Sequence, residues 1–442
     1  MTVTGAARHG MVGSMGAGRK RQEQIYLAGL AGRTGTVPVS PEALERAALA
    51  RLGRDARAYF AGGAGLEHTM AENRAAFGRW HIVPRVMRDV SARDMQVRLL
   101  GRTLPAPILL GPIGVLEMAH GEADLPAARA AAATGVPFVA SSQSSRTMEQ
   151  VAHASGGGPR WFQLYWSARN ELAASFVRRA EQAGYEAIVV TLDTTMLGWR
   201  TRDLENGYLP FLRGRGIANY LSDPVFAGLG DGAERSAAPR PGLGALRSAL
   251  ELLRAHPGGL TAARDLPRTL AAIRRFLAIY SRPDLTWDDL PFLRQHTRLP
   301  ILLKGILHPD DAGRAVAAGV DGVIVSNHGG RQVDGAVAAL DALPGVAAAV
   351  AGRVPVLFDS GVRTGADVFK ALCLGAAAVL VGRPYVWGLA LGGERGVGEV
   401  ISNLLAELDL TMGLSGHRSL HELDRSALRA AEAATGMAVR QV

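Results

Sequence analysis

From about residue 105 onward, short apolar runs alternate with longer segments whose apolar positions repeat at helical spacing. Eight such runs, rich in branched side chains, lie at residues 105–112, 136–142, 160–166, 187–193, 299–305, 321–327, 354–360 and 377–383. Amphipathic, Ala-rich segments occur between them, at residues 122–134, 170–183, 310–318 and 365–374. Runs that are apolar at consecutive positions are typical of strands buried on both faces. Eight strand–helix units therefore predict an α/β fold, a closed (β/α)8 TIM barrel, whereas six or seven would also suit an open sheet.

The rest of the chain divides into an N-terminal tail and one long insertion. We expect residues 1–38 to be a mobile or extended tail and residues 39–442 to form a single barrel domain. The run Ser40-Pro41-Glu42 predicts a helix start, with Ser as cap and Pro in the first turn, and a helix continuing to about Arg57. The interval 202–289, after the fourth strand, is too long for a simple connection and holds helix-like basic segments near 245–254 and 268–279. We interpret it as a lid-like insertion over the barrel mouth; an oligomer contact or a disordered loop are the alternatives.

Composition narrows the class of partner. The formal net charge is +9, but the basic residues are scattered and their longest run is Arg19-Lys20-Arg21, so we expect neither nucleic acid nor a membrane as partner. Anionic ligands, such as a carboxylate or a phosphate, suffice to account for the charge. The single cysteine, Cys373, lies in an apolar helical stretch and is interpreted as core packing. No signal-like or membrane-length run occurs and no zinc-like spacing, which predicts a cytoplasmic protein without a metal site.

Polar or glycine residues follow every one of the eight predicted strands, at the end where this fold carries its chemistry. In chain order these strand ends are Gly111–Gly114, Ser141–Gln143, Gln163 with Tyr165, Thr191 with Asp193 and Arg200, Lys304, Ser326–Arg331, Asp359–Arg363, and Gly382 with Arg383. A lone His after a strand is more often structural than catalytic, and the side chain of a lone Lys can simply fill the barrel interior. Eight such ends in succession predict one shared cavity.

The last two strand ends form a candidate phosphate site. Gly361 and Gly382 would let backbone N–H groups approach a phosphate, and Arg363 and Arg383 would neutralise it. The helix expected to start near Thr364 would point its dipole at the same place. The cofactor or substrate is therefore expected to carry a phosphate.

The remaining strand ends are suited to proton chemistry. His328 is a candidate general base, and Asp193 would stabilise the imidazolium after proton uptake. Arg200 and Arg331 can each bind a carboxylate through two parallel hydrogen bonds. Hydrogen bonds from Tyr59 and Tyr165, and the fixed positive charge of Lys304, would complete the site.

Taken together, these residues resemble the FMN-dependent 2-hydroxy-acid oxidase and dehydrogenase family over about residues 59–420. The most specific matches are the runs Ser326-Asn327-His328-Gly329-Gly330-Arg331-Gln332 and Asp359-Ser360-Gly361-Val362-Arg363. The resemblance implies FMN as cofactor, a small L-2-hydroxy acid as substrate, and a homo-oligomer, tetramer or octamer. It implies that the flavin ring and ribityl chain are held by Pro112, Ile113, Gly114, Ser141, Gln163, Thr191, Lys304 and Ser326, and the ribityl-phosphate end by Asp359, Ser360, Gly361, Val362, Arg363, Gly382 and Arg383. It implies that His328 is the base, with Asp193 in support, that Lys304 stabilises negative charge on the reduced flavin, and that the hydroxy acid is bound by Tyr59, Tyr165, Arg200, His328 and Arg331.

Within that family, residues 160–166 and 191–200 and the long insertion look closest to the lactate 2-monooxygenases. This similarity implies L-lactate as substrate, O2 as acceptor, and decarboxylation of the trapped keto acid to acetate, CO2 and water. The alternatives are an oxidase that releases keto acid and hydrogen peroxide, a dehydrogenase linked to a quinone or cytochrome, and a non-catalytic phosphate-binding barrel. Gln143 stands where plant glycolate oxidases have an aromatic residue, which weighs against glycolate as substrate.

Overall fold

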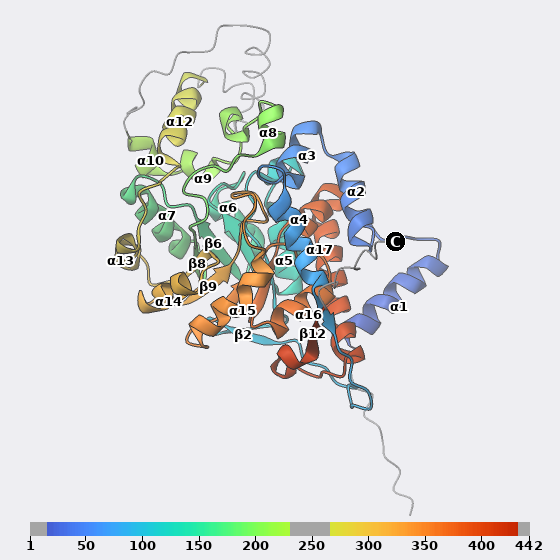
Figure 1. The fold of residues 1–442 in the computed structure, drawn as a ribbon. Helices are drawn as coiled ribbons and strands as arrows, with labels where there is room; N and C mark the ends of the chain where they lie inside the picture. The colour runs from blue at the N-terminus through green and yellow to red at the C-terminus, as the bar shows by residue number, and fades with distance from the viewer. Residues whose placement is uncertain (1–15, 230–265, 432–442) are drawn as a thin grey trace, which may run out of the picture.

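The computed structural model describes residues 16–229 and 266–431. Its centre is a closed barrel of eight parallel strands, in the order β10-β11-β4-β5-β6-β7-β8-β9 (Figure 1). The strands are β4 (Ile108–Leu110), β5 (Phe138–Ser141), β6 (Arg160–Leu164), β7 (Ile188–Thr191), β8 (Ile301–Ile306), β9 (Gly322–Val325), β10 (Val356–Phe358) and β11 (Ala378–Val381). Each coincides with one of the eight apolar runs, β8 extending one residue beyond its run, so the predicted TIM barrel is confirmed.

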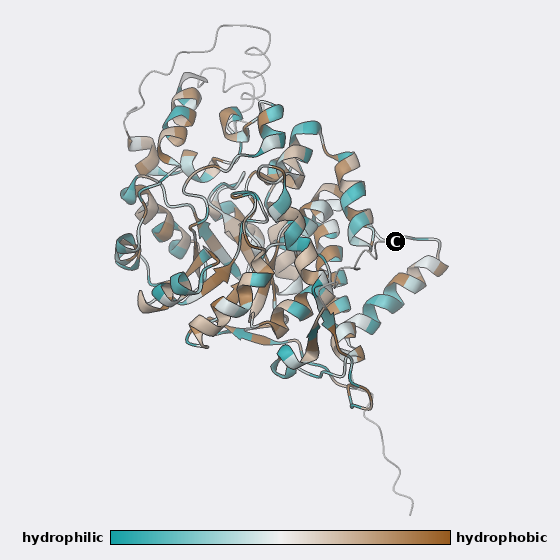
Figure 2. Ribbon diagram, in the orientation of Figure 1, coloured by the Kyte–Doolittle hydropathy of each residue, from teal (hydrophilic) through white to brown (hydrophobic). Residues whose placement is uncertain are grey.

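Helices surround the barrel and cover the outer face of its strands. They are α5 (Leu125–Thr134), α6 (Met148–Ser155), α7 (Asn170–Gln182), α13 (Leu290–Arg294), α14 (Pro309–Ala317), α15 (Ala339–Val350), α16 (Gly365–Cys373) and α17 (Arg383–Leu414). Figure 2 shows apolar residues concentrated on the central strands and polar residues on the outer helices. Cys373 is buried in α16, as expected of a core residue. Among the described residues, no helix is long and apolar enough to cross a membrane.

The interior of the barrel is filled with side chains, and a short hairpin closes the end opposite the cavity. Leu109, Val139, Trp161 and Val189 contribute to this inner layer, and Leu99 and Leu104 pack beneath it. These two leucines come from the hairpin of β2 (Val97–Leu99) and β3 (Arg102–Leu104). A second small sheet pairs β1 (Trp80–Ile82) with β12 (Leu428–Ala430). The filled interior leaves the carboxyl ends of the strands as the place for a cavity.

Part of the N-terminal expectation is wrong. Within the supposed tail of residues 1–38, Ala17–Leu30 forms helix α1, which packs against α17. Two long-range contacts hold it there: the backbone N–H of Gly18 donates to Asp409 (2.8 Å), and Arg21 Nε donates to Asn403 Oδ1 (2.8 Å). The segment has no clear apolar stripe, so its pattern alone does not predict a helix docked on the barrel.

The helix expected from Ser40 to about Arg57 is two helices. Ser40 Oγ does accept from the N–H of Ala43 (3.3 Å) at the start of α2 (Pro41–Arg51). The chain then leaves helical geometry at Leu52 and Gly53, and α3 (Arg54–Ala61) follows, with α4 (His68–Gly78) after it. This break lets α3 bring Tyr59 to the barrel mouth.

The insertion after β7 lies at the carboxyl end of the barrel, where α8, α9, α10 and α12 gather in Figure 1. Its described elements are α8 (Thr201–Glu205), η2 (Pro210–Arg213), α9 (Ala218–Leu221), α10 (Pro224–Gly228) and α12 (Leu266–Ile279). An aromatic cluster joins them, with Phe276 contacting Phe211, Tyr220 and Tyr280 at ring-centroid distances of 4.8–5.3 Å. Helix α12 matches the predicted basic segment near 268–279, whereas the segment near 245–254 lies outside the described residues.

Candidate active site

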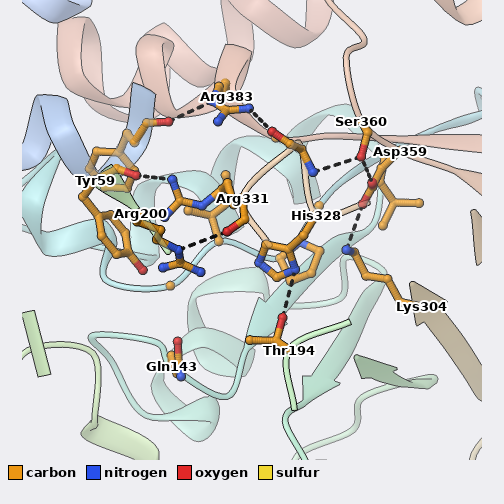
Figure 3. A pocket seen from close by; sticks show the side chains of 18 of the residues that line it. Tyr59, Gln143, Thr194, Arg200, Lys304, His328, Arg331, Asp359, Ser360 and Arg383 are labelled. Carbon is orange, nitrogen blue, oxygen red and sulfur yellow. Dashed lines mark hydrogen bonds and ion pairs between the residues drawn. The ribbon is translucent and has the colours of Figure 1, made fainter. Parts of the chain in front are cut away.

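A cavity opens at the carboxyl ends of the barrel strands and encloses about 1040 Å³, including its open mouth. Such a volume is in the range of small-molecule and cofactor sites. Most of the residues predicted from strand ends line it (Figure 3). They are Tyr59, Pro112, Ile113, Gly114, Tyr165, Arg200, Lys304, His328, Arg331, Asp359, Ser360, Gly361, Val362, Arg363, Gly382 and Arg383.

The remaining predicted residues lie directly behind this lining and are hydrogen-bonded to one another or to it. Ser141 Oγ donates to Gln163 Oε1 (3.1 Å), and Gln163 Nε2 donates to Thr191 Oγ1 (3.0 Å). Ser326 Oγ accepts from Lys304 Nζ (2.8 Å). The structure thus brings all the predicted residues together, in two layers.

His328 and Asp193 form a partly buried pair, with His328 Nδ1 2.8 Å from Asp193 Oδ1 and the two side chains 17% and 11% exposed. Thr194 Oγ1 donates to the same carboxylate oxygen (2.8 Å). Because an ionised carboxylate only accepts, Nδ1 carries the proton of the imidazole and Nε2 keeps its lone pair. Burial lowers the pKa of His328 and outweighs the raising effect of Asp193. The ring is therefore neutral at neutral pH and able to accept a proton at Nε2.

Lys304 supplies a fixed positive charge on the cavity floor. Its Nζ lies 3.2 Å from Asp359 Oδ2 and 3.7 Å from Asp193 Oδ2. Burial favours the neutral amine, but the two carboxylates dominate and raise the pKa of Lys304 above its ordinary value. In the same way, burial disfavours ionised Asp193, yet His328 and Lys304 hold the pKa of Asp193 well below its usual range. Both groups are charged throughout the physiological range.

Two arginines face the same cavity without a carboxylate partner among the described residues. Arg331 donates to the carbonyl of Gly62 (2.9 Å), and its guanidinium lies 5.0 Å from the centre of the Tyr59 ring. Arg200 Nη2 donates to Gln332 Oε1 (3.2 Å). Burial and the charge of Arg200 lower the pKa of Arg331 to about 10. Two adjacent guanidinium groups that lack an acid favour an anionic ligand.

A second pair of cations, Arg363 and Arg383, is partly buried and lines another part of the cavity. Arg363 and Arg383 donate only to backbone carbonyls in the described structure, Arg383 to those of Phe60, Gly329 and Gly62. Burial, with the charge of a neighbouring arginine, lowers the pKa of Arg363 to about 10 and that of Arg383 to about 9. Gly361, whose φ is +99°, lines the same corner, and a Cβ there would lie 2.5 Å from the carbonyl oxygen of Asn73, so the close approach of these two backbones requires glycine. The residues present therefore fit a phosphorylated cofactor.

The helix after Thr364 was expected to point its N-terminus at the phosphate, but side chains of the protein already accept from the N–H groups there. In the first turn of α16, Glu407 accepts from the N–H of Gly365 (2.8 Å) and Thr364 Oγ1 accepts from the N–H of Asp367 (3.0 Å). Just before the helix, Asp367 Oδ2 accepts from the N–H groups of Arg363 (2.9 Å) and Thr364 (3.1 Å). Helix α17, by contrast, starts at the cavity with Gly382 as an N-cap that has no side-chain cap. The helix terminus facing the phosphate corner is therefore that of α17.

Several residues of the cavity were not assigned from the sequence. Phe211 and Tyr280 come from the insertion, and Thr194 and Leu197 from the loop after β7; Phe60 and Leu380 complete this group. Aromatic residues in the insertion were visible in the sequence, but only the fold brings two of them to the cavity.

Comparisons with known proteins agree with this geometry. Residues 48–430 match the family model described as FMN-dependent dehydrogenase. The chain is 42% identical over 409 residues to the FMN-dependent alpha-hydroxy acid dehydrogenase qulF of Penicillium citrinum, covering 92% of this chain and 95% of that one. It is also 42% identical over 388 residues to an L-lactate oxidase of Lysinibacillus sphaericus, covering 87% and 91% of the two chains. A solved structure of mandelate oxidase with (S)-4-hydroxymandelic acid matches with a TM-score of 0.74 and 37% identity, over 89% of this chain and 99% of that one. Because the family model spans most of the chain and these relatives match it over nearly their whole length, the chain belongs to the FMN-dependent dehydrogenase family and is an FMN-dependent 2-hydroxy-acid oxidoreductase.

Proposed function

We propose that this enzyme oxidises small L-2-hydroxy acids, L-lactate among them, with O2 as electron acceptor, and that it decarboxylates the keto acid before release. The overall reaction converts L-lactate and O2 into acetate, CO2 and water. The observation that carries the proposal is the position of Phe211 and Tyr280, which the insertion places in the wall of the same cavity as His328 and Arg331. A cavity walled by an insertion can retain its product through the second half of the reaction.

Substrate binding follows from the charges in the cavity. Arg331 and Arg200 bind the carboxylate, since both lack an acidic partner in the described structure, and the hydroxyl groups of Tyr59 and Tyr165 hydrogen-bond the substrate. Burial raises the pKa of Tyr165 to about 12, so its hydroxyl remains a hydrogen-bond donor at any working pH. His328 Nε2 removes a proton from the substrate, and Asp193 at 2.8 Å stabilises the resulting imidazolium.

The cofactor assignments are part of the same proposal. FMN, when bound, accepts the two electrons of the oxidation and passes them to O2. Its ring and ribityl chain are assigned to the layer of Pro112–Gly114, Ser141, Gln163, Thr191, Lys304 and Ser326, and its phosphate to the corner formed by Asp359–Arg363, Gly382 and Arg383. The charge of Lys304 stabilises the anion formed by reduction.

An oxidase that releases keto acid and hydrogen peroxide is the second candidate, because relatives of this chain carry the name L-lactate oxidase. Aerobic turnover of L-lactate with and without catalase, with acetate, pyruvate and peroxide quantified, separates the two. Acetate that persists with catalase supports decarboxylation inside the site. Pyruvate with stoichiometric peroxide supports the oxidase.

Assembly and location remain predictions. A tetramer or octamer is proposed, and light scattering of the purified protein tests it. The cytoplasmic location expected from the sequence is tested by cell fractionation.

A further inference from the structure

Gln143 is a buried polar side chain that the catalytic scheme does not use. It is 8% exposed and lines the cavity, but its amide has no hydrogen-bond partner among the described residues. In Figure 3 it stands apart from the cluster around His328 and Arg331, with no dashed line to any residue drawn. A buried amide without a partner is destabilising, so a ligand group or a water is expected to satisfy it.

The backbone around Gln143 is fixed from both sides. Its N–H donates to Ser141 Oγ (3.0 Å), and its carbonyl accepts from the N–H of Val115 (3.0 Å). Gly114 packs against it so closely that a Cβ there would lie 3.0 Å from Gln143 Cβ. On the side of the insertion, a Cβ on Gly216 would lie 3.0 Å from the carbonyl oxygen of Gln143. The backbone of Gln143 is therefore held in the cavity wall, and its side chain lines the cavity.

The neighbouring wall is mostly apolar. Ile113, Leu197 and Phe211 line the same cavity and offer no side-chain hydrogen bond, and Tyr280 contributes a ring that packs on Phe276. The carboxylate and hydroxyl of a 2-hydroxy acid are already accounted for by the arginines and His328. The substrate side chain is the part of the molecule left to meet Gln143.

We propose that Gln143 forms the polar end of a side-chain subsite and that the enzyme prefers 2-hydroxy acids whose side chain carries a hydroxyl or carbonyl oxygen. The inference rests on the proposed function and names its substrate class. An amide both donates and accepts, so it satisfies either oxygen. It carries no charge, and it therefore gives a second carboxylate no particular advantage.

The test compares matched substrate pairs that differ by one oxygen: L-lactate with L-glycerate, and L-3-phenyllactate with L-3-(4-hydroxyphenyl)lactate. Anaerobic stopped-flow reduction of the bound flavin gives a dissociation constant and a limiting rate for each. We expect the oxygenated member of at least one pair to bind about three- to tenfold more tightly, as for one neutral hydrogen bond. In Gln143→Met this preference disappears. Gln182→Met, an exposed glutamine at the end of α7, keeps the preference.

The outcomes separate the two proposals. Reduction by L-lactate without a preference in either pair, or a preference that survives in Gln143→Met, overturns the subsite and leaves the proposed function standing. Failure of every hydroxy acid to reduce the flavin overturns the proposed function itself. The wild-type comparison needs no substitution, so it decides the matter even if Gln143→Met fails to fold.

Discussion

Replacing Asp193 by Asn tests the proposed role of the partly buried His328–Asp193 pair. The substitution keeps the size of the side chain and a carbonyl oxygen that can accept from His328 Nδ1, but it removes the negative charge. In the wild type that charge lies 2.8 Å from Nδ1 and 3.7 Å from Lys304 Nζ. The change therefore isolates electrostatic support of the imidazolium from orientation of the ring.

The expected magnitude follows from the separation of the charges. Because the imidazolium charge is spread over the ring, a mean separation of about 4 Å is used, at which unit charges attract by about 4 kcal/mol at an effective dielectric constant of about 20. Since about 1.4 kcal/mol corresponds to a tenfold change in rate, flavin reduction should slow by up to about a thousandfold. The effect should lie in the limiting rate more than in substrate binding, because the imidazolium forms only during the reaction.

Anaerobic stopped-flow reduction by L-lactate measures this rate. Asp321→Asn is the matched control, because Asp321 accepts from the N–H of Ile301 at the opposite end of β8 and should leave the rate unchanged. FMN content and melting temperature confirm that each variant is folded and loaded. A rate within about fivefold of the wild type in fully loaded Asp193→Asn would refute the proposed support of His328.

The pH profile gives a further check on the same pair. Burial already lowers the pKa of His328, so the wild-type rate should fall only as pH drops below the ordinary value of about 6.5. Asp193 raises that pKa, and its replacement by Asn should move the acid limb to still lower pH. A limb that moves to higher pH would contradict the assignment.

Other predictions concern binding and stability. Arg383→Met should lose about 2–5 kcal/mol of FMN binding, measured by fluorescence titration of the apoprotein, whereas the exposed Arg353→Met should bind normally. FMN should raise the melting temperature of the wild-type apoprotein more than equimolar riboflavin does, because only FMN brings a phosphate to Arg363 and Arg383; equal shifts would argue against the phosphate corner. Burial raises the pKa of Glu117 to about 7, above its unfolded value, so the folded state loses stability as pH rises from about 4.5 through 7. Glu117→Gln should therefore be more stable than the wild type at pH 8, by up to about 3 kcal/mol in denaturant unfolding, and similar to it at pH 5.

The barrel could be predicted from sequence because its signal is local. Each strand is buried on both faces, so its sequence is a continuous apolar run. The polar residues at the strand ends mark the edge of the barrel where the catalytic residues lie. Residues as far apart in sequence as Asp193 and His328 could be placed together for this reason. The fold supplies the proximity, and the sequence needs only to supply residue types at strand ends.

The features that could not be predicted depend on contacts between distant segments. Helix α1 is held by Asp409 and Asn403 of α17, which its own pattern does not reveal. The N-terminus of α16 is closed to a ligand by Asp367 and Glu407, although its sequence reads as an open helix start. The contribution of Phe211 to the cavity likewise depends on how the insertion folds back.

The base and the phosphate corner are joined by a shared set of loop contacts, which explains strained backbone in both. His328 and Ser360 adopt φ of +58° and +83°, a region that costs a non-glycine residue about 1–3 kcal/mol. Ser360 Oγ accepts from the N–H groups of Asn327 (3.3 Å) and Gly329 (3.0 Å), and the Gly329 carbonyl accepts from Arg383 Nη1 (3.1 Å). The loops after β9, β10 and β11 therefore hold one another in position. The same hydrogen bonds therefore stabilise the orientation of His328 and the position of Arg383. Binding of the cofactor phosphate to Arg383 should in turn stabilise the orientation of His328.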